Sequence, residues 1–152
     1  MKSIKDIVNE CFPLENWEMK EWNFKNRIDR EGTDRDSFLQ ILTKAFEENK
    51  IMKLHGEWHR GIGKTTFLIK VAEEYKIPLL VNTKVHAANL LKEYNKNLEI
   101  YSLPYSELRG IKSKYILLDL RCNNDIIEKI KDEGLIPLGF IYPSKPHKYE
   151  LI

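Results

Sequence analysis

Cysteine is scarce in this 152-residue sequence: Cys11 and Cys122 lie far apart and belong to no CxxC pair. A disulfide framework or a zinc knuckle is built from several closely spaced cysteines, so the sequence argues against both. Isolated cysteines suit a reducing compartment, and we therefore expect a cytoplasmic protein.

Long apolar runs and an excess of one charge are also missing. A membrane-spanning helix needs roughly 18 or more apolar residues in succession, whereas charged residues interrupt even the N-terminal stretch MKSIKDIVNECF. We therefore expect no signal peptide and no membrane contact. The 25 basic and 23 acidic residues leave a net charge of +2. Nucleic acid stays open as a partner, but this charge does not indicate it.

The sequence does have enough apolar residues for a folded domain. Hydrophobic residues make up 42% of the chain, and a chain of this length buries roughly 70% of the surface that it exposes when unfolded. We expect one compact domain with two parts, an N-terminal extension over residues 1–48 and a core over residues 49–152.

The extension is highly charged up to about residue 36 and contains Trp17, Trp22 and Phe24. Aromatic and basic residues together can bind single-stranded nucleic acid, but the simpler interpretation is packing against the sheet or a protein partner. Apolar residues at helical spacing then predict an amphipathic helix from Asp36 to Glu48, with Asp34 or Asp36 as its N-cap.

The core alternates short apolar runs with helical periodicity, which is typical of βαβ units. The predicted fold class is α/β, a three-layer core similar to that of P-loop NTPases, with a mainly parallel sheet flanked by helices. Pro78 and Gly134 are expected to stop helices, and the tail from Pro143 to Pro146 reads as irregular. The predicted strands are Ile51–His55, Leu79–Asn82, Tyr115–Leu120 and Ile136–Tyr142, with a weaker one at Leu98–Tyr101, and the predicted helices are Lys64–Tyr75, Lys84–Asn95 and Asn123–Glu133.

A candidate phosphate-binding loop, HRGIGKTT, lies between the first predicted strand and the helix that follows it. Glycines let successive N–H groups turn toward one anion, and the positive end of the next helix adds attraction. In such loops the lysine reaches the β- and γ-phosphates and the next hydroxyl binds Mg²⁺, roles that we expect for Lys64 and Thr65. Thr66 is expected near the α-phosphate. The expected nucleotide-binding residues are Arg60, Gly61, Ile62, Gly63, Lys64, Thr65 and Thr66.

This loop departs from the GxxxxGK[ST] pattern because Trp58 stands where the first glycine is expected. Gly56 cannot replace that glycine without lengthening the loop by two residues. The alternative interpretation is a flexible turn that only caps the following helix. The spacing of His55 and His59 does not match HExxH, and the segment is predicted as strand and loop, so we do not expect zinc there.

A second motif, YILLD, places Asp119 near the end of a predicted buried strand, where a P-loop enzyme needs a carboxylate for magnesium. The alternative is an aspartate that only caps a turn. Leu120 follows, where many ATP-hydrolysing proteins have the glutamate that polarises water, so we expect slow hydrolysis. Glu57 and Asp125 are weak candidates for the missing base.

Positive charge on the transferring phosphate is the remaining requirement of this chemistry. Arg60 lies within the loop and is expected to contact the phosphates, which makes Arg60, Lys64 and Asp119 the candidate catalytic residues. For Arg109 and Arg121 a surface role is the simpler interpretation. Thr65 and Asp119 are the candidate metal ligands.

The stretch from Ile51 to Ile141 resembles the ATPase core of phage and helicase-like P-loop proteins, particularly the large-terminase DNA-packaging motors. The motifs that carry the resemblance are HRGIGKTT, LLVNT with VHAANLLKEY, and LRG with YILLD. The resemblance implies phosphate and magnesium binding by Lys64 and Thr65, a γ-phosphate contact by Arg60, and Asp119 as the first residue of an Asp-Glu pair, which Leu120 breaks. At this length we expect neither a second motor domain nor a nuclease domain, and the resemblance implies a phage or mobile-element origin.

These observations lead to one main hypothesis and two alternatives. The main hypothesis is a Mg²⁺-dependent protein that binds ATP or GTP, hydrolyses it slowly or only with a partner, and has a protein partner. The first alternative is a small P-loop kinase, although the sequence shows no arginine-rich lid. The second is a non-hydrolysing interaction module built on an ATPase fold.

Overall fold

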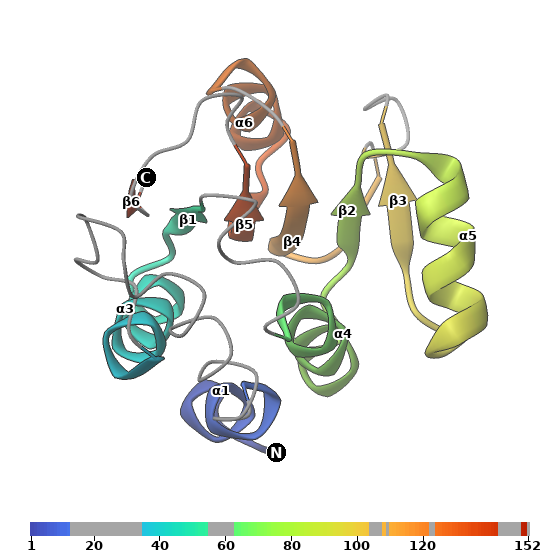
Figure 1. The fold of residues 1–152 in the computed structure, drawn as a ribbon. Helices are drawn as coiled ribbons and strands as arrows, with labels where there is room; N and C mark the ends of the chain where they lie inside the picture. The colour runs from blue at the N-terminus through green and yellow to red at the C-terminus, as the bar shows by residue number, and fades with distance from the viewer. Residues whose placement is uncertain are drawn as a thin grey trace, which may run out of the picture.

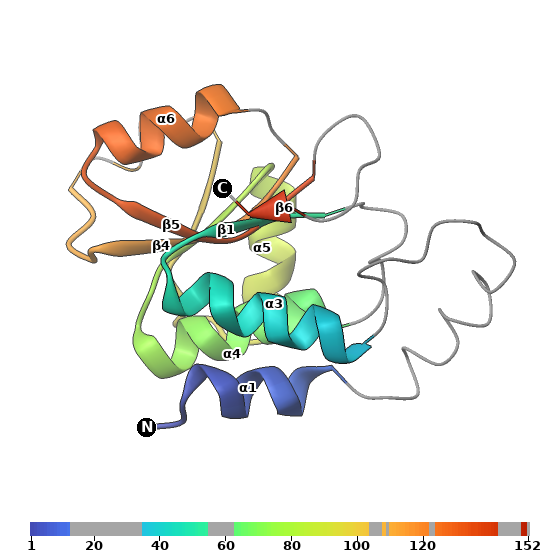
Figure 2. The same cartoon turned by 90° about the vertical axis from the view of Figure 1, so that its left-hand side faces the viewer.

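The computed structural model of the chain describes residues 1–12, 35–54, 63–103, 108, 110–121, 124–142 and 150–151. Its centre is a sheet with helices on both faces (Figures 1 and 2). Helix α6 (Asn124–Asp132) covers one face, and α3 (Arg35–Glu47) and α4 (Lys64–Tyr75) cover the other. In Figure 2, α1 (Ile4–Cys11) lies beneath α3 and α4 as an additional outer layer. Helix α5 (Lys84–Glu93) flanks the sheet beside β2 and β3.

The described strands form one sheet in the order β3-β2-β4-β5-β1-β6. The first five of these run parallel, and β6 pairs antiparallel with β1 at one edge. This confirms the predicted α/β class with a mainly parallel sheet flanked by helices. The strands are β1 (Ile51–Lys53), β2 (Leu79–Val81), β3 (Ile100–Ser102), β4 (Tyr115–Leu120), β5 (Ile136–Ile141) and β6 (Glu150–Leu151).

The central strands are apolar on both faces because each face is covered by helices. Side chains alternate between the two faces of β4: Leu117 joins the cluster beneath α3 and α4, whereas Leu118 and Leu120 join the cluster beneath α6. By the same alternation, Asp119 lies on the α4 side of the sheet. The residue predicted as a metal ligand therefore faces the helix that begins with Lys64.

A group of phenylalanines holds the beginning of α4 against the N-terminal helices. The ring of Phe67, in the first part of α4, lies 5.6 Å from Phe12 and 5.3 Å from Phe46, measured between ring centroids. All three side chains are buried. The side chain of Arg35 donates a hydrogen bond from Nε to the carbonyl oxygen of Phe12 at 2.9 Å. The end of α1, the start of α3 and the start of α4 thus form one packed unit.

Several sequence predictions were wrong in detail. Helix α1 was not predicted, although Ser3 caps it by accepting a hydrogen bond from the Asp6 N–H at 3.1 Å. Asp36 is not an N-cap, because α3 begins at Arg35 and Asp36 lies within its first turn, while Asp34 is outside the described residues. Strand β6 was also missed. The tail predicted to be irregular, Pro143 to Pro146, lies outside the described residues.

The two helices with a predicted stop residue end close to where the sequence predicts. Gly134 has φ +82°, and the Leu135 N–H returns to the carbonyl of Ile130, so glycine ends α6 as predicted. Helix α4 ends at Tyr75 as predicted, and Lys76 takes the left-handed conformation at its C-cap, two residues before Pro78. The strand predicted at Leu98–Tyr101 lies one to two residues later, as β3, because Leu98 belongs to the preceding turn.

Candidate functional site

The candidate site lies at the edge of the sheet where the parallel strands have their carboxyl ends. Asp119 is the second-last residue of β4, Asn82 follows β2, and Tyr142 follows β5. Because these strands are parallel, all three residues lie at one edge. Helix α4 begins at the same edge, since it returns antiparallel to the strands before β2.

The order of the strands singles out the end of β5 within this edge. The chain leaves β1 toward α4 on one face, and it leaves β4 toward α6 on the other face (Figure 1). Strand β5 lies between β1 and β4 in the sheet. In open α/β sheets, ligands bind outside the carboxyl ends of strands at such a change of side. The end of β5, which leads into Tyr142, is therefore the expected binding position.

Tyr142 connects the two residues that the sequence analysis placed in different motifs. The Nζ atom of Lys64 lies 5.1 Å from the centroid of the Tyr142 ring, within the range of a cation–π interaction. The Tyr142 hydroxyl donates a hydrogen bond to the Asp119 carboxylate. The first residue of α4 and the polar residue of β4 thus contact one common side chain, although they are 55 positions apart (119 minus 64).

The electrostatics of this group keep the tyrosine protonated. Burial raises the pKa of Tyr142 well above its usual value of 10.0, and the charge and hydrogen bond of Asp119 raise it further. The positive charge of Arg121 acts in the opposite direction and lowers this pKa. Arg121 is exposed, and its backbone N–H donates to Asn82 Oδ1 at 3.3 Å. The hydroxyl therefore remains a hydrogen-bond donor at neutral pH, with a cation nearby.

Gly63, immediately before Lys64, has a backbone conformation that requires glycine. Its φ is +113°, and an added Cβ would lie 2.2 Å from the carbonyl oxygen of Cys11. The sequence analysis assigned Gly63 to a phosphate cradle. The structure adds a second reason for glycine, because the end of α1 packs directly against this turn.

The first turn of α4 is only partly covered. Lys64, Thr65 and Thr66 are half-buried, whereas Phe67 is buried and donates its N–H to the Gly63 carbonyl at 2.9 Å. In any α-helix the N–H groups of the first turn have no acceptor within the helix, and they make the helix start attractive to anions. Lys64 and Thr65 are therefore at a position that suits a negatively charged group.

The structure brings together only some of the predicted site residues. Gly63, Lys64, Thr65 and Thr66 lie at the start of α4, on the same face of the sheet as Asp119. Leu120 is fully buried under α6, so no side chain at that position faces the site. Asp125 is exposed on α6, which covers the opposite face. The remaining predicted or considered positions, Arg60, Gly61, Ile62, Glu57, Trp58 and Arg109, lie outside the described residues.

Sequence reasoning missed Tyr142 and Asn82 as members of this site. A usable signal was present, because both residues stand at the carboxyl end of a predicted parallel strand, as Asp119 does. The sequence analysis considered charged residues at these strand ends, such as Asp119 and Arg121, and not a phenol or an amide. Placing them beside Asp119 also required the strand order, which the sequence does not reveal.

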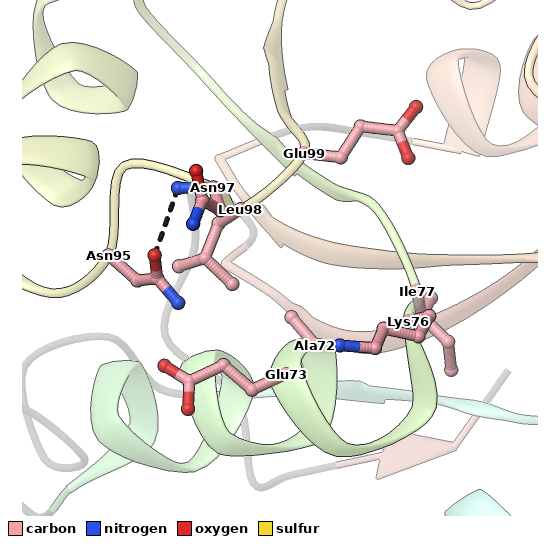
Figure 3. A pocket seen from close by; sticks show the side chains of 8 residues that line it. All are labelled: Ala72, Glu73, Lys76, Ile77, Asn95, Asn97, Leu98 and Glu99. Carbon is pink, nitrogen blue, oxygen red and sulfur yellow. Dashed lines mark hydrogen bonds between the residues drawn. The ribbon is translucent and has the colours of Figure 1, made fainter.

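A hollow of about 330 Å³ lies near the edge of the sheet where β2 and β3 have their amino ends (Figure 3). Figure 3 shows Glu73 and Lys76 from the end of α4 on one side and Asn95, Asn97 and Glu99 on the other. None of these polar side chains is fully buried. The hollow lies about 16 Å from Lys64 along α4, given a rise of about 1.5 Å per residue. It is therefore separate from the candidate site.

The residues that the structure describes contain no group of three or more histidine, cysteine or acidic side chains arranged to hold a metal ion. A nucleotide-bound Mg²⁺ needs fewer protein ligands, because phosphates and water supply the others. Among the described helices, none has the length and hydrophobicity that a bilayer span demands.

Comparison of the chain with protein-family models, with curated proteins and with solved structures found no match.

Proposed function

We propose that this chain binds a Mg²⁺-complexed nucleoside triphosphate, ATP or GTP, at the carboxyl end of β5, between the start of α4 and Asp119. The observation that carries the proposal is the meeting of Lys64 and Asp119 at Tyr142. An ammonium group and a carboxylate on one face of a parallel sheet, beside a helix start, match the needs of a polyphosphate and its cation.

The residues at this edge fit magnesium by their chemistry. Mg²⁺ prefers oxygen ligands and is usually held by one or two protein groups together with phosphates and water. The Thr65 hydroxyl and the Asp119 carboxylate supply such oxygens, and both side chains are half-buried. When bound, the ion neutralises phosphate charge. In this proposal Lys64 would bind the terminal phosphates, and Thr65 and Asp119 would hold the cation.

The same site supports only slow hydrolysis without a partner. Catalysis of hydrolysis needs a group that orients the attacking water, and the residue after Asp119 is a leucine buried beneath α6. Asp125 lies on α6, which covers the other face of the sheet. Arg121 is exposed, and its charge lowers the pKa of Tyr142. A second candidate function, a nucleotide-binding module that does not hydrolyse, is favoured by the same buried Leu120. A protein partner would then recognise the nucleotide-bound form of the chain.

Titration calorimetry with ATP and with GTP, each with and without Mg²⁺, tests the binding proposal. We expect Lys64→Ala to weaken binding by about a hundredfold, which corresponds to about 2.7 kcal/mol and to the loss of a charge-assisted contact with phosphate. Lys70→Ala is the matched control, because Lys70 is exposed on the same helix. Equal affinities of the Lys64→Ala variant and the wild type would contradict the proposal.

Phosphate release under single-turnover conditions separates the two candidate functions. Slow release that disappears in Asp119→Asn indicates an NTPase. Tight binding with no release over hours indicates the non-hydrolysing module. Release that requires an added acceptor hydroxyl would instead favour a kinase.

A further inference from the structure

Tyr142 has two contacts of different chemistry, made by two parts of one side chain. The face of its ring lies 5.1 Å from Lys64 Nζ, and its hydroxyl donates to the Asp119 carboxylate. The backbone of the residue is also fixed, because its N–H donates to the carbonyl oxygen of Leu120 at 2.8 Å. This bond extends the β4–β5 ladder by one residue, so the ring is carried by the sheet.

The contact with the ring restricts a long and flexible side chain. A lysine has four rotatable bonds and loses considerable entropy when it is fixed. The negative face of an aromatic ring attracts an ammonium group without forming a salt bridge. The ring thereby holds Lys64 near the end of β5 and leaves its positive charge intact.

The hydroxyl of Tyr142 orients the Asp119 carboxylate and occupies only one of the acceptor positions of that carboxylate. An ionised carboxylate has two oxygens and about four acceptor positions. One hydrogen bond from Tyr142 fixes its rotation and leaves acceptor positions for a bound cation. A ligating group held in this way meets the cation with less loss of freedom.

We propose that Tyr142 is a positioning residue of the nucleotide site, whose ring places the Lys64 ammonium for the phosphates and whose hydroxyl orients Asp119 for the magnesium ion. The inference rests on the proposed function. It adds that two different parts of one side chain at the end of β5 position the two halves of the site: the ring positions Lys64 and the hydroxyl positions Asp119.

Two substitutions separate these parts. Tyr142→Phe keeps the ring and removes the hydroxyl, and Tyr142→Leu removes both. Calorimetry measures the dissociation constant of ATP in EDTA and in Mg²⁺. We expect Tyr142→Phe to bind ATP in EDTA with the same dissociation constant as the wild type. The factor by which Mg²⁺ lowers that dissociation constant should be about tenfold smaller in the variant, which corresponds to the loss of one hydrogen bond to a charged group. We expect Tyr142→Leu to weaken binding in EDTA as well, by roughly threefold to tenfold.

Tyr101→Phe is the matched control. Its hydroxyl also donates to a carboxylate, that of Glu99, but on the edge strand β3. We expect this variant to bind ATP with and without Mg²⁺ like the wild type. Thermal unfolding of both phenylalanine variants checks that each is folded at the temperature of the titration.

A spectroscopic measurement tests the ring contact without nucleotide. Reductive methylation with ¹³C-formaldehyde labels lysine amines, and a Lys64→Arg variant identifies the Lys64 resonance. The ring above the amine predicts an upfield shift that persists in Tyr142→Phe and disappears in Tyr142→Leu. An unshifted Lys64 resonance in the wild type would overturn the ring contact and the inference.

The outcomes distinguish the inference from the function on which it rests. If Lys64→Ala loses binding while Tyr142→Phe keeps the full effect of Mg²⁺, the positioning role is wrong and the nucleotide site stands. If Lys64→Ala binds like the wild type, the proposed function fails and the inference fails with it. A selective loss of the Mg²⁺ effect in Tyr142→Phe, absent in Tyr101→Phe, is the result that supports the inference.

Discussion

Replacing Gly63 with alanine tests the contact between α1 and the start of α4. The new Cβ would lie 2.2 Å from the Cys11 carbonyl oxygen, whereas Cβ atoms essentially never come closer than 3.0 Å to another atom. One of the two backbones must therefore move by at least 0.8 Å (3.0 minus 2.2). Neither moves easily, because Phe12 and Phe67, the residues next to this contact, are both buried.

The expected cost combines two effects. A non-glycine residue at φ +113° is strained, at a cost of about 1–3 kcal/mol. Forcing extra volume into a packed contact costs about 1–3 kcal/mol more. In the opposite direction, alanine lowers the entropy of the unfolded chain, which stabilises the folded state by about 0.4–1 kcal/mol. We expect Gly63→Ala to lower the free energy of unfolding by about 1–5 kcal/mol, which can be a large part of the stability of an ordinary domain.

Gly134→Ala provides the control for backbone strain alone. Gly134 has φ +82°, but an added Cβ would meet nothing within 4 Å. We expect a loss of only about 1–2 kcal/mol in this variant. Urea unfolding followed by circular dichroism measures both. If Gly63→Ala costs no more than Gly134→Ala, the tight contact between α1 and the turn before Lys64 is contradicted.

Other residues give further tests of the packing. Phe67→Ala should lower the free energy of unfolding by about 3–5 kcal/mol, because removing a fully buried ring leaves a cavity. Val85→Ala, at a position 72% exposed, should change it by no more than about 0.5 kcal/mol. Urea unfolding compares the two variants, and similar values would argue against this core. Gly139→Ala should destabilise strongly, since a Cβ there would lie 2.6 Å from a backbone oxygen of β4, and a melting temperature within about 2 °C of the wild type would refute that packing. Burial raises the pKa of the Cys11 thiol above its usual 9.0, so in a Cys122→Ser background we expect slow reaction with a thiol reagent at pH 8 that becomes fast in urea. Because the folded-state pKa is the raised one, Cys11 should leave stability unchanged below pH 9 and reduce it as the pH rises through that pKa, which unfolding at pH 7, 9 and 10.5 would detect by comparison with Cys11→Ala.

The sheet was predictable because its strands are buried on both faces. Runs such as YILLDL and IPLGFI are apolar for nearly their whole length, which is the pattern of a covered parallel strand. Their type and approximate ends were therefore right. The order of the strands was not predictable, because it depends on pairing between segments that are distant in the sequence, such as Ile51 with Gly139.

Helix α1 shows a different kind of miss. Ile4, Ile7, Val8 and Cys11 have the spacing of a helical face, and Ser3 is a favourable N-cap. The high charge of the segment drew attention away from this pattern. Charge on a helix is compatible with burial of its other face, so the signal was present and was given too little weight.

The candidate site was predictable only for residues with a known motif. Lys64 and Asp119 were found because a loop lysine and an acidic strand end are expected of a phosphate site. Tyr142 follows no motif, and its importance depends on where β5 lies in the sheet. A side chain between two elements can be identified only when the neighbours of each strand are known.

The pairing of β1 with β5 has a consequence for the order in which the chain can fold. Ile51 and Gly139 are 88 residues apart (139 minus 51), yet they are direct partners in the sheet. Strand β1 leaves the ribosome long before its neighbour exists, and the intervening β2, β3 and β4 can pair among themselves first. Non-local parallel pairing is slow, because a long loop must close before the contact forms. Strand β1 therefore stays open to pairing with other molecules until β5, in the last quarter of the chain, has been made and has paired with it.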